Sequence, residues 1–269
     1  CYDAVHVHNG SFFRLEDHLD RWDNAIEERR YTSLGMDREQ VAEVLHGCVA
    51  RANLRDSMIT FVATRGSPTT GHKDLRTCNN QFMVWALPYY KVVSDEELSA
   101  GSDIVIADTI RIPPESVDPR IKNFGRLDFV RSLFEAYDRN APYAVLLDQE
   151  DNVTEGRGWN IFALNGGVLL SPDSGVLEGI TRRTVVELSE KLNIDCRLTK
   201  IPATTLREAD EVFITSTAGG IMPVRGIDGE PVGDGAPGPV TTRLKEMYWQ
   251  LHDDPAYATP VRYELAQTA

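Results

Sequence analysis

The chain has 269 residues, of which 42% are hydrophobic and 26% charged, as expected of a globular protein with one or two domains. Its formal net charge of −13 opposes contact with nucleic acid and with anionic lipid, and no apolar run approaches the ~20 residues of a membrane helix. Both partner classes are therefore excluded. The four cysteines form no CxxC pair and no metal-ligand spacing, which indicates reduced thiols in a cytoplasmic protein without a metal site.

The first third of the chain predicts strand, helix, helix, strand, strand. It starts at Cys1, without a methionine, and enters a strand-like stretch at once, so we expect the N-terminal part of a first domain to be absent from this sequence. Two helical stripes follow, one formed by Leu15, Leu19, Trp22 and Ile26, the other running from Val41 to Ala52. Buried strands are predicted at Ser57–Arg65 and Gln81–Leu87.

A polar stretch, Gly66–Asn80, separates these two strands and shows no apolar periodicity. A loop of this length is often functional, although a solvated hairpin loop fits equally well. The charged and small residues of Val93–Gly101 indicate a boundary. We therefore expect a small α/β domain at residues 1–97 and a large domain at residues 98–269.

The second domain begins with a predicted strand, Ile104–Asp108, and a proline-rich turn, Arg111–Arg120. An amphipathic helix is expected at Phe124–Asn140, with Leu127, Val130, Phe134 and Tyr137 on one side. Further strands are predicted at Tyr143–Leu147, Trp159–Leu164, Val168–Leu170 and Val212–Ser216, and helices at Thr181–Leu192 and Thr241–Leu251. Strands and helices mix without strict alternation, which indicates a two-domain α+β fold.

Two turns could hold an anion. Leu177-Glu178-Gly179-Ile180-Thr181 opens a helix, where free N–H groups and the helix dipole favour negative charge. Thr181 as a plain N-cap is the commoner meaning of such a sequence. Ser216-Thr217-Ala218-Gly219-Gly220 is a similar small-residue turn after a strand. Each signal is weak when taken alone.

Three charged residues also have ordinary interpretations. Arg21 fits a solvated helix surface, and Glu155 in the turn Thr154–Gly158 fits an exposed acid. Lys122 lies between Ile121 and Phe124, and burial among apolar neighbours can prepare a lysine for Schiff-base chemistry. Composition alone does not distinguish it from the other lysines.

Five segments in order change these interpretations: FFRLEDHLDRW, IKNFGRLDFV, VTEGRGWNIF, LEGITRRTV and ITSTAGGIMPV. Together they resemble the class IV, or fold-type IV, pyridoxal-phosphate aminotransferases over Tyr2 to about Tyr263. The likeness favours the (R)-selective amine transaminases, through YDAVHVHNGSFFRL, TAGGIMPV and GAPGPVTTRLKEMYW. The resemblance implies the two-domain fold of D-amino acid aminotransferases and a pyridoxal 5′-phosphate cofactor.

The resemblance also implies a role for each matching residue. Lys122 would form the Schiff base with the cofactor and shuttle a proton, and Glu155 would pair with the protonated ring nitrogen. Arg21 would bind the phosphate, together with the helix start at Gly179, Ile180 and Thr181 and the turn at Ser216 and Thr217. Leu177 would pack against the ring.

The implied substrate pocket departs from the family pattern. Tyr2, His6, Lys73, Arg157 and Ala218 would line it. Branched-chain and D-amino acid enzymes of the family tend to have arginine at the position of His6, so its absence favours an amine substrate. Lys73 falls near the place of a mobile loop arginine, with His72 and Arg76 as neighbours, but lacks the flat bidentate guanidinium. Arg157 replaces a small residue and could supply the missing carboxylate contact or shrink the pocket.

The resemblance therefore predicts a transaminase that moves an amino group between an (R)-amine or D-amino acid and a keto acid such as pyruvate. Two enzymatic alternatives keep the cofactor: a branched-chain L-amino acid aminotransferase and an aminodeoxychorismate lyase. The non-enzymatic alternative is a scaffold that has lost catalysis, which Lys122, Glu155 and Arg21 argue against. Family members share pocket loops between subunits, so we expect a homodimer or a higher homo-oligomer.

Overall fold

The computed structural model describes residues 1–71 and 73–267. Contacts within the chain divide it into two units. The first unit comprises Cys1–Tyr90, Ile121–Phe124 and Leu251–Ala269, and the second comprises Lys91–Arg120 and Gly125–Gln250. This division differs from the domains expected from the sequence, because the C-terminal segment and the residues around Lys122 group with the N-terminal unit. None of the helices in the described ranges is long and apolar enough to cross a bilayer.

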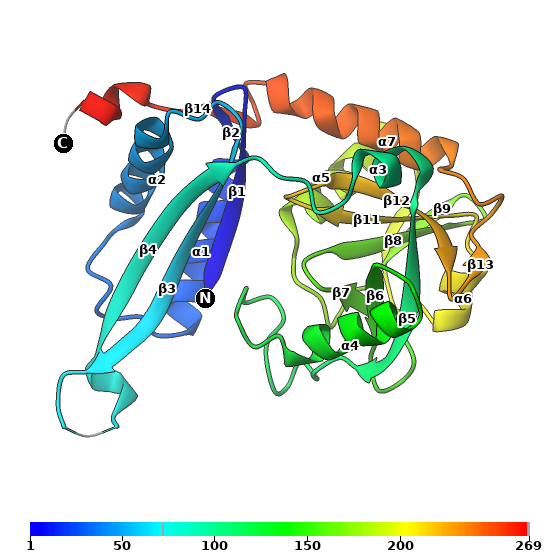
Figure 1. The fold of residues 1–269 in the computed structure, drawn as a ribbon, viewed down its shortest axis with the longest axis horizontal. Helices are drawn as coiled ribbons and strands as arrows, with labels where there is room; N and C mark the ends of the chain where they lie inside the picture. The colour runs from blue at the N-terminus through cyan, green and yellow to red at the C-terminus, as the bar shows by residue number, and fades with distance from the viewer. Residues whose placement is uncertain (72, 268–269) are drawn as a thin grey trace. The chain divides into compact units, whose positions relative to one another are not determined.

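The first unit is a five-stranded sheet in the order β14-β2-β1-β3-β4, with helices α1 and α2 on one face (Figure 1). Its pairings are antiparallel. The strands are β1 (Tyr2–His8), β2 (Ser11–Phe13), β3 (Ser57–Pro68), β4 (Cys78–Pro88) and β14 (Ala258–Pro260). The helices are α1 (Leu15–Glu28) and α2 (Arg38–Ala52), with short 3₁₀ turns η1 (Leu75–Thr77), η2 (Leu251–Asp253) and η3 (Tyr263–Gln267).

Strand alternation decides which face of this sheet each side chain joins. Val5 and Val7 of β1 pack with Leu19 and Trp22 of α1 in the core of the unit. Because successive strand residues point to opposite faces, Tyr2, Ala4 and His6 lie on the other face. The residues expected to line a pocket therefore share the face that the two helices do not cover.

The polar stretch between β3 and β4 is shorter than predicted. Both strands continue beyond their apolar residues, so the hairpin extends to Pro68 on one side and starts again at Cys78. Gly66 takes a positive φ of 71°, and a Cβ there would lie 1.8 Å from the carbonyl oxygen of Asn79. Only glycine permits this close approach, which lets a polar sequence stay paired.

The second unit is built on a nine-stranded sheet with the path β10-β9-β8-β11-β12-β5-β6-β7, and β13 pairs with β12. The strands are β5 (Ser102–Ile110), β6 (Tyr143–Leu147), β7 (Val153–Gly156), β8 (Asn160–Asn165), β9 (Val168–Ser171), β10 (Cys196–Leu198), β11 (Glu211–Ser216), β12 (Gly220–Ile227) and β13 (Glu230–Pro231). A bridge between Gly156 and Trp159 joins β7 back to the start of β8. Six strands, β8-β11-β12-β5-β6-β7, thus close on themselves like a barrel.

Helices cover this barrel from outside. They are α3 (Asp95–Ala100), α4 (Leu127–Asp138), α5 (Ile180–Lys191), α6 (Ala203–Arg207) and α7 (Pro239–Gln250) (Figure 1). Ile104 and Ile106 of β5 point into the large core of the unit, whereas Val105 and Ala107 pack with Ala136 of α4. A strand buried on both faces reads as a continuous apolar run, which is the pattern of Ile104–Ala107.

Two features of local structure in this unit go beyond what the sequence predicts. The stretch taken as a boundary contains helix α3, whose capping box joins Ser94 and Glu97. The apolar stripe of α4 faces outward, with Leu127 and Phe134 more than half exposed, while Phe129, Ser132 and Ala136 form the buried face. The helix also spans Leu127–Asp138 instead of the longer range expected.

Candidate functional site

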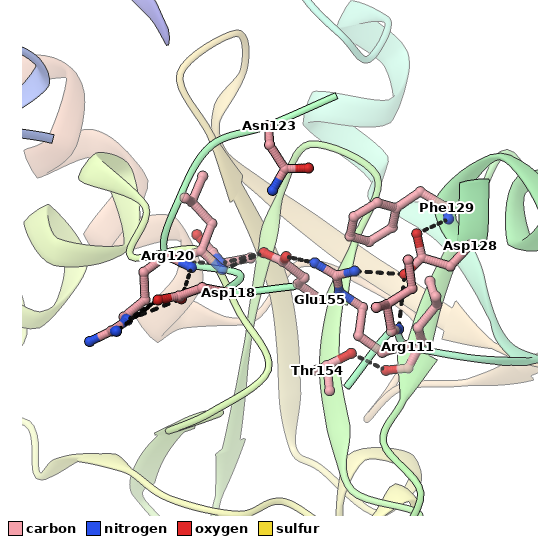
Figure 2. A network of polar contacts seen from close by, with 12 residues as sticks. Arg111, Asp118, Arg120, Asn123, Asp128, Phe129, Thr154 and Glu155 are labelled. Carbon is pink, nitrogen blue, oxygen red and sulfur yellow. Dashed lines mark hydrogen bonds and ion pairs between the residues drawn. The ribbon is translucent and has the colours of Figure 1, made fainter. Parts of the chain in front are cut away.

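Glu155 lies at the end of β7 and is 5% exposed. Its Oε2 accepts hydrogen bonds from the backbone N–H of Leu177 at 2.9 Å and from Nδ2 of Asn160 at 3.2 Å. Its Oε1 accepts from Nη2 of Arg111 at 3.2 Å (Figure 2). The acid expected to pair with a ring nitrogen is therefore a buried, oriented carboxylate and not an exposed turn residue.

The helix start expected to bind phosphate belongs to α5, which begins at Ile180. Gly179 occupies the N-cap position and carries no side chain that could cap the helix. The first-turn residues Ile180 and Thr181 are buried, and Thr181 Oγ1 lies 3.5 Å from the hydroxyl of Tyr248. The first N–H groups of a helix have no partner within the helix, so this start offers donors to an anion.

The second small-residue turn belongs to the same cluster. Thr215 of β11 pairs with Asn160 of β8, and Ser216 and Thr217 follow directly at the strand end. Asn160 also donates to the carbonyl of Leu177 at 2.9 Å, two residues before Gly179. Asn160 thus links the acid and the segment before α5 through its side-chain amide, and pairs with the strand before this turn through its backbone.

Two arginines lie near the turn between β7 and β8. Arg157 is exposed within this turn, directly after Gly156. A Cβ placed on Gly158 would lie 3.6 Å from Nη2 of Arg126, whose guanidinium is 5.4 Å from the ring centre of Phe129. Arg157 and Arg126 therefore both add positive charge beside the turn that follows Glu155.

Lys122 groups with the first unit. Its carbonyl accepts the N–H of Tyr2 at 3.1 Å, and its Nζ lies 4.9 Å from the centre of the Tyr2 ring. That ring also stacks on Phe124, with a centroid separation of 4.7 Å. The segment of Lys122 is thus attached to the start of β1, and its amine lies over an aromatic face.

Arg21 forms a buried ion pair with Asp3 of β1. Its Nε and Nη2 each donate to the carboxylate at 2.8 Å, and Nδ1 of His18 lies 2.9 Å from the same group. Burial opposes the charge of Asp3, but the charges of Arg21 and His18 outweigh it and hold the pKa of Asp3 well below its ordinary value. Asp3 therefore fixes the orientation of the arginine expected to bind phosphate.

The two remaining residues expected in the pocket of the first unit differ in burial. His6 is 2% exposed, its Nδ1 lies 3.3 Å from Nε2 of His252, and its ring stacks on Tyr89. Burial, with His252 and His8 nearby, lowers the pKa of His6 to about 2, so its ring is neutral. Lys73 is exposed in the loop after β3, next to Asp74, which pairs with Arg76. His72 lies outside the described residues.

Sequence reasoning missed four residues of these clusters: Arg111, Asp128, Asn160 and Asp3. The sequence places Arg111 only in a turn, and Asp128 lies within a predicted helix without an assigned role. Asp3 and Asp128 are acids within apolar stretches, at strand and helix positions that face inward. An acid at a core position requires a buried cation, and that requirement was the available signal.

The family model described as "Amino-transferase class IV" matches residues 1–227. A putative branched-chain-amino-acid aminotransferase of Methanocaldococcus jannaschii is 30% identical over 92% of this chain and 85% of its own length. The branched-chain-amino-acid aminotransferase of Escherichia coli K12 is 29% identical over 93% of the chain and 81% of its length. The chain spans 47% of the length of the branched-chain-amino-acid aminotransferase-like protein 1 of Arabidopsis thaliana, at 30% identity.

Solved structures give the same likeness. The T.th. branched-chain amino acid aminotransferase with pyridoxamine 5′-phosphate superimposes with a TM-score of 0.90 at 28% identity, over 97% of this chain and 89% of that one. The Escherichia coli enzyme gives a TM-score of 0.90 at 26% identity, over 97% and 90%. The expected α+β fold is thereby confirmed.

Proposed function

The chain belongs to the class IV aminotransferases, pyridoxal-phosphate-dependent transaminases, and from this premise we propose that it moves an amino group between a branched-chain L-amino acid and a keto acid. The relatives and structures reported above carry the branched-chain name, which supports this class of substrate over the (R)-amine class that the sequence motifs favoured. The buried cluster around Glu155 is the observation that supports the cofactor chemistry of this proposal, since a buried carboxylate suits a cationic ring nitrogen.

The residues present fit the cofactor. A buried carboxylate with three donors suits a protonated ring nitrogen, and Gly179 leaves the start of α5 open to a phosphate. We propose that Arg21, Thr181, Ser216 and Thr217 bind the phosphate and that Leu177 packs against the ring. When bound, pyridoxal phosphate acts as an electron sink for the charge that forms as Cα loses its proton. Lys122 would carry that proton on Nζ.

A second candidate function is transfer from an (R)-amine or a D-amino acid, and His6 favours it. A neutral, buried imidazole offers no charge to a substrate carboxylate, and lysine or arginine from elsewhere must then supply it. We propose Arg157 before Lys73 for this contact, because Arg157 follows Glu155 by two positions, whereas Lys73 lies on a hairpin loop.

Initial rates with L-leucine, D-alanine and (R)-1-phenylethylamine, each with 2-oxoglutarate or pyruvate as acceptor, distinguish these candidates. We expect L-leucine to react fastest. Fast turnover of the amine beside negligible turnover of L-leucine would reverse the order of the two proposals. A colourless protein after incubation with pyridoxal phosphate would instead favour the scaffold, and pyruvate release from aminodeoxychorismate would favour the lyase.

Arg157→Ala tests the carboxylate contact. Loss of a charge-assisted hydrogen bond costs about 1.5–3 kcal/mol, so KM for L-leucine should rise by about 10-fold or more. KM for (R)-1-phenylethylamine, which has no carboxylate, should stay unchanged. Lys73→Ala serves as the matched comparison, and a larger KM effect there would assign the contact to the loop.

We also propose that the chain forms a homodimer through the outward stripe of α4. Leu127, Val130, Phe134 and Tyr137 are all at least 42% exposed and lie at helical spacing along one face. A contiguous exposed apolar stripe on a globular protein marks an interface. Light scattering should show a dimer for the wild type and a monomer for Phe134→Glu; Arg131→Glu, a change at a neighbouring exposed position, provides the comparison for added charge alone.

A further inference from the structure

Arg111 lies between two buried carboxylates. Its Nη1 donates to Oδ2 of Asp128 at 2.6 Å and its Nη2 to Oε1 of Glu155 at 3.2 Å (Figure 2). The three side chains are each 5–7% exposed. Asp128 also accepts the N–H of Ile112 at 3.1 Å. The guanidinium of Arg111 is therefore bonded to Asp128 through one terminal nitrogen and to Glu155 through the other.

An ionised carboxylate at this depth requires compensation. Burial disfavours the charged form of an acid, while hydrogen bonds and a nearby cation favour it. Leu177 and Asn160 supply neutral donors to Glu155, and Arg111 supplies a full positive charge bonded directly to it. Arg182 interacts with Glu155 electrostatically, but its side chain donates to Ser171 and to the carbonyl of Pro172.

One guanidinium bonds directly to both carboxylates of this group, which we call the triad. We propose that Arg111 is a positioning residue that keeps Glu155 ionised before the cofactor arrives, so that the carboxylate is ready to pair with a protonated ring nitrogen. This inference rests on the pairing of Glu155 with the ring nitrogen under the proposed function.

The same arginine joins three elements of the second unit. Arg111 follows the end of β5, Asp128 lies in the first turn of α4, and Glu155 lies in β7. The contacts Arg111–Asp128 and Ile112–Asp128 tie the end of β5 to the start of α4. One side chain thus anchors the start of this helix and the acid of the triad.

Equilibrium binding of pyridoxamine 5′-phosphate tests the proposal, because this form has the ring nitrogen and the phosphate but makes no covalent bond to Lys122. Kd is measured by fluorescence at about pH 6 and about pH 8.5 for the wild type and for Arg111→Gln. Without the arginine, Glu155 should take up a proton at the lower pH and must release it for the ligand to bind. Kd should therefore rise by about 10-fold or more near pH 6, as for other buried supporting contacts, and by less near pH 8.5.

Three controls make the result specific. Arg197→Gln removes an exposed arginine paired with Asp195 and should leave both Kd values unchanged. Arg111→Lys keeps the charge and should restore the pH dependence of the wild type, although a single ammonium cannot span both carboxylates. An equal rise of Kd at both pH values in Arg111→Gln would reduce the arginine to a structural support and overturn the proposal.

Infrared difference spectra of the apoprotein, wild type minus Glu155→Gln, give a test that does not depend on the folding of the arginine variant. A carboxylate band near pH 6 is expected, and a protonated carboxyl band would overturn the proposal. Wild-type affinity of Glu155→Gln for pyridoxamine 5′-phosphate would instead contradict the pairing of Glu155 with the ring nitrogen, so the two failures are distinguishable.

Discussion

At the scale of single residues, buried charges of the two units follow one pattern. Asp3 holds Arg21 in the first unit, and Arg111 holds Glu155 in the second. In each pair a residue implied to bind the cofactor is oriented by a partner to which the resemblance assigns no role. Charged groups buried in this way are stable only when paired and hydrogen-bonded, so each partner is needed for folding as well as for binding.

Asp3→Asn should destabilise the apoprotein by about 3 kcal/mol or more, because it leaves the charge of Arg21 buried without its counter-ion. Urea denaturation measures this change. The exposed pair formed by Asp195 and Arg197 provides the control, since Asp195→Asn should change stability by no more than about 0.5 kcal/mol. A similar small change for Asp3→Asn would mean that Arg21 finds water or another acceptor.

His6 gives the first unit a sensitivity to acid. Its pKa is lowered to about 2 in the folded chain, first by burial and then by His252 and His8, and is ordinary near 6.5 when unfolded. The unfolded state therefore binds a proton that the folded state does not, and stability falls as the pH drops below 6.5. The slope for this one group approaches about 1.4 kcal/mol per pH unit.

Denaturation of the wild type and of His6→Asn at several pH values between about 7 and 5 measures this slope. The variant should lose less stability over that range, even if it starts less stable. Parallel curves for the two proteins would show that the imidazole of His6 keeps a proton when folded.

At the scale of elements, the start of α5 depends on the absence of a side chain at Gly179. Its φ of −65° suits any residue, but a Cβ there would lie 2.0 Å from Oδ1 of Asn160. Gly179→Ala must therefore displace Asn160, which bonds both Glu155 and the carbonyl of Leu177. A substitution at Gly179 therefore tests the steric conflict with Asn160 alone, because it requires no change in the backbone conformation.

We expect Gly179→Ala to lower the affinity for pyridoxamine 5′-phosphate by about 10-fold or more, from the loss of one or two buried hydrogen bonds worth about 1 kcal/mol each. Fluorescence titration measures the affinity. Gly71→Ala is the matched control, since a Cβ at Gly71 meets nothing within 4 Å. Unchanged affinity in Gly179→Ala would mean that Asn160 can move without disturbing Glu155.

Helix α4 shows where reasoning from periodicity fails. The stripe of Leu127, Val130, Phe134 and Tyr137 was identified correctly as one side of a helix, and yet the side that packs inward carries Asp128 and Ser132. Apolar residues at helical spacing predict an apolar face on a helix. They do not tell whether that face packs within the same chain or against another molecule. The inward acid belongs to the triad with Arg111 and Glu155.

At the scale of the whole molecule, local sequence predicted most elements and the fold class, because strand and helix periods are local properties. The long-range links could not be predicted in this way. Glu155 looked like an exposed turn residue until β7, β8 and the segment before α5 came together around it. The family motifs supplied its implied role, whereas Arg111, which lies outside those motifs, was found only from its contacts.

The substrate was the part that the sequence predicted least well. The motifs of this chain favoured (R)-amines, while the relatives with high coverage act, by name, on branched-chain amino acids. Specificity generally depends on a few side chains, here proposed to include His6 and Arg157, and no pattern of spacing gives their positions in space. The cofactor, in contrast, is shared by the family and is confirmed.

The bridge between β7 and the start of β8 has a consequence for how slowly the backbone amides of these strands exchange with solvent. Amides of buried strands that have a neighbour on both sides exchange with solvent deuterium only when a large part of the structure unfolds. The amides of β6, β7 and β8 should therefore be among the slowest to exchange, and those of residues 73–77 in the hairpin loop among the fastest. If mass spectrometry gives this order, Glu155 is held by the most persistent part of the chain, while the candidate substrate-contacting loop rearranges many times before the barrel opens once.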